Sequence, residues 1–486
     1  MAHDRRPRRP LSKRRAVSLR AARGYYAAIA ACTGPRGDAP LEPQTPASGT
    51  TRQPRIFYGW YLVAGSILTN TVLSAAYFQG MSAFAVSIEA HFGWSRSVVG
   101  AAMSMRQMES GITSPLVGIL MDKVKARTLL FWSALITGIG LVGLGLINGV
   151  ATFFLAIFVI SIGTSGMSHA VTWPVLIARW FRRRLGTATG WAVMGPIFGS
   201  PFVILNTSLE ETYGWRTIII AYGLIVLVFL TLISLIARER PEPYGLRPDG
   251  DPPERDAQGV AVRTPAPLRG MTARRAMRTK EFWLFMGYLS GMFMVNSAFQ
   301  VHQIFYFVED TGLTKSEAAV TFTLVFLLSG IGRLGAGYML DKADYRLVLA
   351  VVAGMLTASM LYLQFVTVTS ILLAMPFVAL FGIGFGSVIP TRGTLGSMMF
   401  GGRSLGSIVG ILQGGSVAAG VVGPIFMAWV FDVTGDYRAS IWVLAFIGAL
   451  MIPTAFAMGS PRRLSARIRL VERQTAAAAR QGGERG

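Results

Sequence analysis

Long apolar segments separated by short polar ones make up most of the chain between residues 57 and 458. Each segment is rich in Ala, Val, Leu, Ile, Phe and Gly and nearly free of charge. Each is close to the ~20 residues that an α-helix needs to cross the ~30 Å hydrocarbon core of a bilayer. The apolar residues are continuous and do not alternate with polar ones, which argues against the strands of a transmembrane β-barrel. The pattern therefore predicts membrane-spanning helices.

Counting these segments predicts an all-α membrane protein with twelve transmembrane helices in two pseudo-symmetric six-helix bundles. The helices are expected at 57–80, 97–120, 128–147, 151–178, 186–208 and 216–237, and then at 282–307, 316–340, 346–366, 369–392, 404–430 and 438–458. The expected domains are a disordered basic extension (1–55), an N-terminal bundle (56–237), a polar linker (238–280), a C-terminal bundle (281–460) and a basic tail (461–486).

The composition excludes other classes of protein. With 52% hydrophobic and 14% charged residues, the chain is too apolar for a soluble enzyme of its size. The net charge of +22 would suit a nucleic-acid binder, but 29 of the 46 Lys and Arg lie in 1–55, 238–280 and 461–486. Basic segments beside membrane helices favour the cytosol, so both termini and the linker are expected there, in a multi-pass protein of the cytoplasmic membrane. A single cysteine and four scattered histidines predict no metal site and no cofactor.

The two halves contain an internal repeat. The segment Gly118–Lys123 reappears as Gly337–Lys342, 219 residues later, at the end of the second helix of each half. Further on, Gly186 and Gly190 pair with Gly406 and Gly410. Two homologous six-helix halves can rock about a central site, which is the geometry that alternating access requires.

At Gly118 through Arg127 the sequence resembles the signature loop between helices 2 and 3 of the major facilitator superfamily. The finer resemblance is to its bacterial monocarboxylate transporter-like branch, which includes oxalate/formate exchangers. It rests on Phe57-Tyr58-Gly59-Trp60, on Trp180-Phe181-Arg182-Arg183-Arg184, on Tyr213-Gly214-Trp215-Arg216 and on the linker segment 240–250. The resemblance implies a transporter whose conformational-switch loops contain Gly118, Asp122, Lys123, Arg127, Gly337, Asp341 and Lys342.

Arg333 is the leading candidate for substrate binding. It lies eight residues before Asp341, or about 12 Å into the eighth helix. An unpaired guanidinium there costs at least ~2.5 kcal/mol, so it is expected to face a wet cavity or an anionic partner. The planar guanidinium can donate two parallel hydrogen bonds to a carboxylate, and the resemblance places the family's substrate-binding arginine at this position. The alternative is a structural salt bridge, and Ser329 stands one turn earlier where better-studied members carry an acidic or amide residue.

Glu109 is the leading candidate for proton coupling. Arg106 and Glu109 are three residues apart in the second helix and can neutralise each other, either as a permanent ion pair or as one that is broken during transport. His302 is the next candidate, because histidine titrates near neutral pH, although a histidine at a wet helix end needs no special role. Weaker candidates for lining the substrate cavity are Ser329, Asn296, Gln413, Tyr77 and Trp173.

The number of buried cations suggests the charge of the substrate. Oxalate exchangers of the branch use a second cation, a lysine in helix 11, where this chain has Ser416, and Arg392 is the nearest substitute. One buried cation predicts a monocarboxylate, moved by proton symport or in exchange for another anion. The expected partners are this small organic anion, a proton or counter-anion, and membrane lipids, with the protein a monomer. The alternatives are a polyspecific efflux pump and a non-transporting metabolite sensor. Catalysis is not expected, because no nucleophile with a base and no phosphate loop is present.

Overall fold

The computed structural model describes residues 57–167, 170–252, 268–366 and 368–459. The predicted extension (1–55) and tail (461–486) lie outside these residues. The described part is helical, and its only β-type pairing is a single bridge between Gly270 and Gly401.

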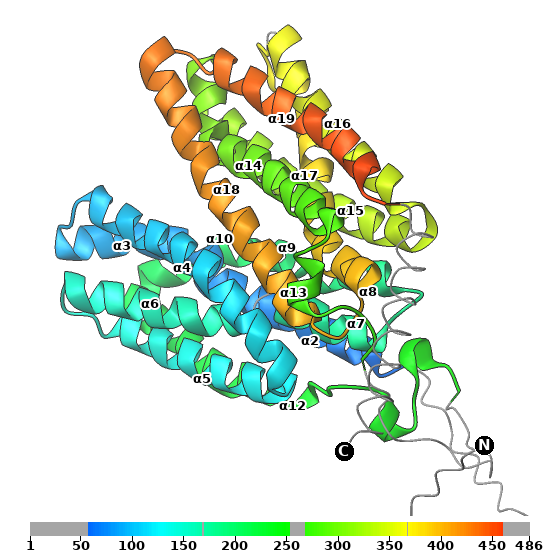
Figure 1. The fold of residues 1–486 in the computed structure, drawn as a ribbon. Coiled ribbons are helices and arrows are strands. Elements are labelled where there is room, and N and C mark those ends of the chain that lie inside the picture. The colour runs from blue at the N-terminus through cyan, green and yellow to red at the C-terminus, as the bar shows by residue number, and fades with distance from the viewer. Residues whose placement is uncertain (1–56, 168–169, 253–267, 367, 460–486) are drawn as a thin grey trace, which may run out of the picture. The chain divides into compact units, whose positions relative to one another are not determined.

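The N-terminal half (residues 57–237) contains six consecutive helical rods, several of them interrupted (Figure 1). They are α2 (Gly59–Leu73), η1 (Ser74–Phe78) and α3 (Gly80–Phe92); α4 (Arg96–Lys123); α5 (Ala126–Gly145); α6 (Val150–Met167) and α7 (Thr172–Trp180); α8 (Leu185–Ala192), α9 (Gly195–Gly199) and α10 (Pro201–Tyr213); and α11 (Trp215–Ile225), η2 (Val226–Leu230) and α12 (Thr231–Ile236).

The C-terminal half (residues 268–459) contains six long helices after a short one, α13 (Ala273–Ala276). The long helices are α14 (Lys280–Glu309), α15 (Lys315–Lys342), α16 (Tyr345–Phe365), α17 (Ile371–Phe400), α18 (Leu405–Thr434) and α19 (Arg438–Ala457). Between the halves, the linker forms two short turns, η3 (Glu242–Tyr244) and η4 (Pro248–Gly250). We call the end of the bundle where α4, α12 and α15 finish the linker end.

Eleven helices in the described part are long and apolar enough to cross a membrane, so the chain is a multi-pass membrane protein. The remaining long helix, α4, has 28 residues but is not among the eleven. It carries Arg106 and Glu109 in its interior and charged residues at its ends, which lower its mean hydropathy. The predicted all-helical fold is confirmed, and α4 is the predicted span that hydropathy alone does not support.

Several helices are longer than predicted. The first rod, expected to end at residue 80, continues to Phe92, where Gly93 takes a left-handed conformation (φ 65°). The tenth, expected to end at residue 392, continues to Phe400, where Gly401 ends it with a positive φ of 79°. The apolar run marks the part of a helix inside the bilayer, whereas hydrogen bonding carries the helix beyond it to a glycine that can leave the helical conformation.

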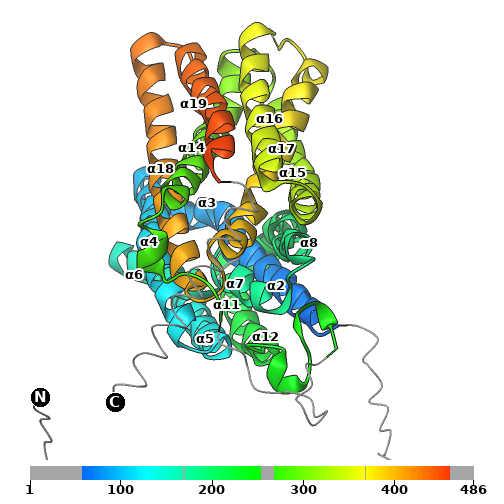
Figure 2. The ribbon, with the colours of Figure 1, turned by 45° about the vertical axis from the view of Figure 1, so that its right-hand side comes forward.

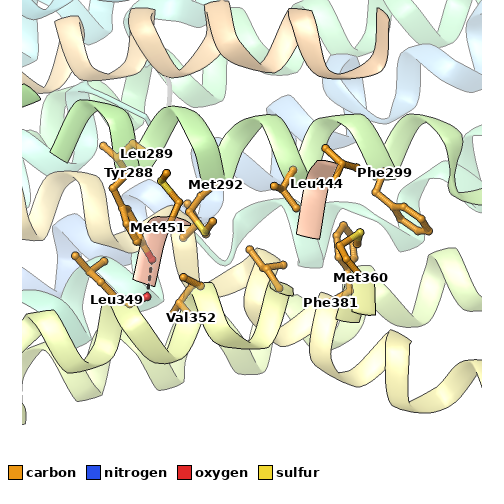
Figure 3. Packing of buried hydrophobic residues seen from close by; sticks show 14 of the residues in the cluster. Tyr288, Leu289, Met292, Phe299, Leu349, Val352, Met360, Phe381, Leu444 and Met451 are labelled. Atoms are coloured by element: carbon orange, nitrogen blue, oxygen red, sulfur yellow. Dashed lines mark hydrogen bonds between the residues drawn. The ribbon is translucent and has the colours of Figure 1, made fainter. Parts of the chain in front are cut away.

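Each half has its own apolar core. Figure 3 shows part of the C-terminal core, where side chains from α14, α16, α17 and α19 interdigitate. The hydroxyl of Tyr288 donates a 2.8 Å hydrogen bond to the carbonyl oxygen of Leu349 and so joins α14 to α16. Because lipid is as apolar as these side chains, close packing and such hydrogen bonds hold the helices together rather than hydrophobic exclusion from water.

The two halves meet mainly through two helix pairs, α4 with α18 and α15 with α8 (Figure 1 and Figure 2). At the first crossing Gly118 contacts Gly406, and an added Cβ on Gly118 would lie 2.2 Å from the carbonyl oxygen of Gly406. At the second, an added Cβ on Gly337 would lie 2.4 Å from the carbonyl oxygen of Gly186. Only glycine permits this approach, and the repeat seen in the sequence therefore marks the surface where the halves touch.

Candidate functional site

A pair of aspartates fastens the two halves together at the linker end. Asp341, near the end of α15, accepts hydrogen bonds of 2.7 Å from the backbone N–H groups of Gly186 and Thr187 and from the Thr187 hydroxyl. Asp122, near the end of α4, accepts 2.9 and 2.8 Å hydrogen bonds from the backbone N–H groups of Gly406 and Ser407, and one of 2.6 Å from the Ser407 hydroxyl.

Each aspartate thus caps the first turn of a helix that belongs to the other half. The first N–H groups of a helix have no partners within it and carry partial positive charge, which a carboxylate neutralises. The internal repeat contains these aspartates and also Gly186 and Gly406, but the sequence does not predict that they contact each other. The other predicted members of these loops, Lys123, Arg127 and Lys342, have exposed side chains.

Arg333 lies where the halves meet. Its side chain is buried (3% exposed), and its Nη1 donates a hydrogen bond to the carbonyl oxygen of Val193, in the other half. In the described part of the chain Arg333 forms no ion pair, and its Nε has no hydrogen-bond partner. The expected alternative, a structural salt bridge, is therefore not found among the described residues.

A proline explains why the Val193 oxygen can accept from Arg333. Pro196 has no N–H to donate to the Ala192 carbonyl, which instead accepts a 2.9 Å hydrogen bond from the Ser66 hydroxyl. The helix tightens here, because Ile197 N–H bonds to Met194 at 2.9 Å and not to Val193. The break between α8 and α9 thus presents an unpaired carbonyl to α15.

Ser329, one turn before Arg333, packs against α17. It is fully buried, and its hydroxyl donates a 2.6 Å hydrogen bond to the Phe326 carbonyl of its own helix. Gly386 of α17 packs directly on its backbone, since an added Cβ on Gly386 would lie 1.9 Å from the Ser329 carbonyl oxygen. A part for Ser329 in binding substrate stays a prediction.

Arg392 is a second buried cation, so the expectation of a single one is wrong. Its side chain is 7% exposed, its Nη1 donates to Oε1 of Gln413, and among the described residues it has no carboxylate partner. The depth of Arg392 within the tenth helix is not evident from the sequence, because the apolar run predicts that this helix ends at residue 392. With α17 continuing to Phe400, Arg392 lies eight residues, about 12 Å, from the helix end.

Arg106 and Glu109 do not pair with each other in the described structure. The guanidinium of Arg106 lies over the rings of Tyr77 and Phe78, 5.4 and 5.6 Å from their centroids. Glu109 accepts hydrogen bonds from the hydroxyls of Thr113 and, at 3.4 Å, Ser165. Three residues correspond to a rotation of about 60° around the helix, enough to turn the two side chains toward different neighbours.

Glu109 consequently faces away from the contact between the halves. It lines a cavity of about 970 Å³ between α4, α5 and α6, whose other walls are mostly apolar. Tyr77, expected in the substrate cavity, places its hydroxyl 2.9 Å from that of Ser161 in α6 and is fully buried within its own half. Only its ring contacts another candidate, Arg106.

The imidazole of His302 contacts two groups of its own, C-terminal half. Its Nε2 lies 3.1 Å from the carbonyl oxygen of Pro424, and its Nδ1 lies 3.2 Å from the Tyr437 hydroxyl. Burial raises the pKa of Tyr437 to about 12, so this hydroxyl remains protonated at neutral pH. A neutral imidazole that donates from Nε2 and accepts at Nδ1 satisfies both contacts. This arrangement favours a structural role for His302.

Several buried polar atoms in the described residues lack hydrogen-bond partners, and they come from both halves. They include Arg106 Nη1 and Trp173 Nε1 from the N-terminal half, and Asn296 Oδ1, Arg333 Nε and Arg392 Nε from the C-terminal half. Buried polar groups are normally satisfied, so such a set is typical of an interior that handles polar molecules.

Two six-helix halves that meet at glycine-lined crossings, with buried arginines that have no carboxylate partner in the described part of the chain, are an arrangement typical of membrane transporters. The family profile of the Major Facilitator Superfamily matches residues 67–411 and 303–481. The chain belongs to this superfamily.

Relatives of known sequence include monocarboxylate transporters. The chain is 23% identical over 414 residues to monocarboxylate transporter 12-B of Danio rerio, covering 80% of this chain and 84% of that protein. It is 22% identical over 417 residues to human monocarboxylate transporter 2, covering 80% and 85%. A 38 kDa uncharacterized protein of Thermoproteus tenax is 24% identical over 412 residues, with 83% and 97% covered.

Solved structures share the fold at lower identity. The E. coli fucose:proton symporter FucP superposes with a TM-score of 0.62 at 15% identity, covering 83% of this chain and 100% of that one. A bacterial homologue of the iron transporter ferroportin, in an outward-facing state, gives a TM-score of 0.63 at 12% identity, covering 83% and 99%. The expected major facilitator fold and the resemblance to monocarboxylate transporters are thus confirmed.

Proposed function

We propose that this protein moves a small organic anion, in the first place a monocarboxylate, across the cytoplasmic membrane by alternating access. The observation that carries the proposal is Arg333, a buried guanidinium at the contact between the halves that has no carboxylate partner among the described residues. Its present partner is a neutral carbonyl oxygen, which a carboxylate can displace because hydrogen bonds to charged acceptors are roughly twice as strong. The names of the monocarboxylate transporter relatives support the same class of substrate.

In this proposal α4 is the twelfth membrane helix, and the two charged residues in its interior, Arg106 and Glu109, contact protein groups. The linker end is cytosolic, because the basic residues Lys123, Lys125, Arg127 and Arg182–Arg184 lie there, whereas Glu210 and Glu211 lie at the opposite end. The capped contacts of Asp122 and Asp341 then close the cytosolic side, and the described conformation is the one that receives substrate from outside. The transport is driven by a proton, for which Glu109 is the leading carrier, or by exchange with another anion.

Arg392 favours a second candidate substrate, a dicarboxylate. Two buried arginines without carboxylate partners in the described part of the chain, Arg333 and Arg392, can neutralise two negative charges where one would serve a monocarboxylate. The two candidates differ in the charge of the transported anion and in nothing else about the mechanism.

Uptake of radiolabelled mono- and dicarboxylates by reconstituted protein tests the proposal. Arg333→Lys should reduce uptake of the best substrate at least roughly tenfold, because a single ammonium cannot reproduce the two parallel hydrogen bonds of guanidinium. Arg403→Lys, at an exposed position outside the site, serves as the matched control and should transport normally. Wild-type rate and affinity in Arg333→Lys, or flux of organic cations only, would overturn the proposal.

A further inference from the structure

A second cavity, separate from the transport site, lies at the linker end. Its volume is about 330 Å³, and its walls come from three parts of the chain: the end of α7 and start of α8, the linker, and the turn between α17 and α18. Four arginines line it, Arg179, Arg182, Arg240 and Arg269, together with one carboxylate, Glu242. None of these residues takes part in the proposed transport mechanism.

An ion pair and hydrogen bonds hold the segments that carry two of these arginines, Arg179 and Arg182. The side chain of Arg179 is 6% exposed, forms an ion pair with Glu239 and donates a 3.1 Å hydrogen bond to the carbonyl of Met121. The backbone N–H of Arg182 donates a 3.1 Å hydrogen bond to Asp249 of the linker, which leaves its guanidinium outside that contact.

Arg269 is held by the bridge between the linker and the C-terminal half. Gly402 N–H donates a 2.8 Å hydrogen bond to the Arg269 carbonyl, and Met271 N–H donates one of 2.8 Å to the Phe400 carbonyl. The two backbone segments approach closely because Gly270 and Gly401 both have positive φ, at 131° and 79°. The bridge therefore sets Arg269 in the wall of the cavity.

The charge in the cavity favours an anion. Four arginines outnumber the three carboxylates, Glu242 in the lining, Glu239 on Arg179 and Asp249 at the backbone of Arg182. Guanidinium groups supplied by different segments of the wall match the several oxygens of a phosphate group better than the two of a carboxylate. We propose that this cavity binds a phosphate group, supplied either by a soluble phosphorylated compound or by the headgroup of an acidic phospholipid.

Occupation of this site would hold the two halves together. Leu185 and Leu405 both line the cavity, and the residues that follow them, Gly186 and Gly406, are those capped by Asp341 and Asp122. Leu405 also belongs to the apolar core of the N-terminal half, although it lies in the C-terminal half. The cavity therefore exists only while the linker end is closed, and a bound phosphate would favour that state and slow the transport cycle.

The direct test uses the full-length protein, inorganic pyrophosphate as the soluble probe, and nanodiscs of phosphatidylglycerol or phosphatidylcholine as the lipid probes. In a Cys32→Ser background, Met398→Cys places a reporter thiol in the cavity wall. Pyrophosphate, or phosphatidylglycerol relative to phosphatidylcholine, should slow labelling of this thiol by a charged maleimide several-fold. The double variant Arg182→Gln/Arg269→Gln should lose the protection, whereas Arg274→Gln/Arg278→Gln, outside the lining, should keep it.

The outcomes separate the sources of the phosphate group and the possible errors. Protection by pyrophosphate identifies a soluble ligand, and protection by phosphatidylglycerol alone identifies a lipid headgroup. Absence of protection by either probe, or equal protection in both double variants, would overturn the site. Size-exclusion chromatography in detergent shows whether Arg182→Gln/Arg269→Gln is folded, and carboxylate uptake without phosphate should be retained in it. Failure of the transport proposal leaves the labelling test unaffected, because neither the labelling nor the check of folding requires a substrate.

Discussion

Asp341 and Thr187, separated by 154 residues and belonging to different halves, are joined by two hydrogen bonds of 2.7 Å, one from the backbone N–H and one from the hydroxyl. The same relationship recurs between Asp122 and Ser407. The contact that closes the linker end is therefore built twice, once from each copy of the repeat, with the donor helix in one half and the aspartate in the other.

Removing the charge of either aspartate should loosen the linker end. In Asp341→Asn one carboxylate oxygen becomes an amide that cannot accept, and the favourable interaction with the helix N-terminus is lost. We expect the closed state to lose about 1–3 kcal/mol relative to the open one. The measurement is the rate at which an introduced cysteine is labelled in a Cys32→Ser background. Ser407→Cys is combined with Asp341→Asn, and Thr187→Cys is combined with Asp122→Asn, so that each cysteine reports on the contact that keeps its aspartate.

The symmetry supplies the internal comparison for this prediction. Asp122→Asn should act like Asp341→Asn, because its three hydrogen bonds are equivalent. Asp344→Asn is the control and should leave the linker end unchanged. Asp344 pairs with Arg346 at the start of its own helix, and this pairing lowers the pKa of Asp344. Equal labelling in Asp341→Asn and in the parent would show that the aspartates do not hold this state.

A methyl group at the glycine crossing should prevent the halves from closing. In Gly337→Ala the new Cβ would lie 2.4 Å from the backbone carbonyl oxygen of Gly186, which cannot move without displacing α8. Gly335→Ala on the same helix meets nothing within 4 Å and is the matched control. Labelling of Thr187→Cys in a Cys32→Ser background should therefore become faster in Gly337→Ala only, because Thr187 contacts Asp341 while the linker end is closed. Unchanged labelling in both variants would mean that this crossing is not a contact of the closed state.

Arg392 should determine the charge of the preferred anion. Arg392→Gln removes the cation and leaves Gln413 facing an amide, which can still exchange a hydrogen bond with it. If Arg392 neutralises a second carboxylate, dicarboxylate uptake should fall at least roughly tenfold while monocarboxylate uptake is retained, since a hydrogen bond to a charged group contributes about 1.5–3 kcal/mol. Competition uptake assays with paired mono- and dicarboxylates of equal chain length measure the ratio. An unchanged ratio would assign Arg392 a structural role.

Glu109→Gln should uncouple transport from the proton. The amide mimics a protonated carboxyl group, and its oxygen can still accept from the Thr113 hydroxyl, so the local packing should survive. We expect no accumulation on an imposed pH gradient, with exchange of substrate between the two sides retained, because only the return of the empty carrier requires deprotonation. Thr113→Val, which keeps the carboxylate, is the control for packing. Accumulation by a folded Glu109→Gln protein would move the proton site to another residue, with His302 next.

The helices, the division into two halves and the repeated glycines and aspartates could be predicted from the sequence alone. Hydropathy and helix period are local properties, so apolar runs of membrane length give helices wherever the chain lies. The repeat was equally visible, because Gly118, Asp122, Gly337 and Asp341 recur at a fixed offset. The depth of Arg333 followed from its distance to Asp341 along one helix, which requires no knowledge of other helices.

Which groups face each other depends on the docking of the helices. Arg106 and Glu109 share a helix, but packing against different neighbours directs one to the Tyr77 ring and the other to Thr113 and Ser165. The partner of Arg333 is the Val193 carbonyl, 140 residues away, which is free because Ile197 N–H bonds to Met194 at the helix break. Arg392 is a buried cation because α17 continues to Phe400. Contacts between distant segments depend on how helices dock and on where they end, and neither is encoded in the local pattern of apolar and polar residues.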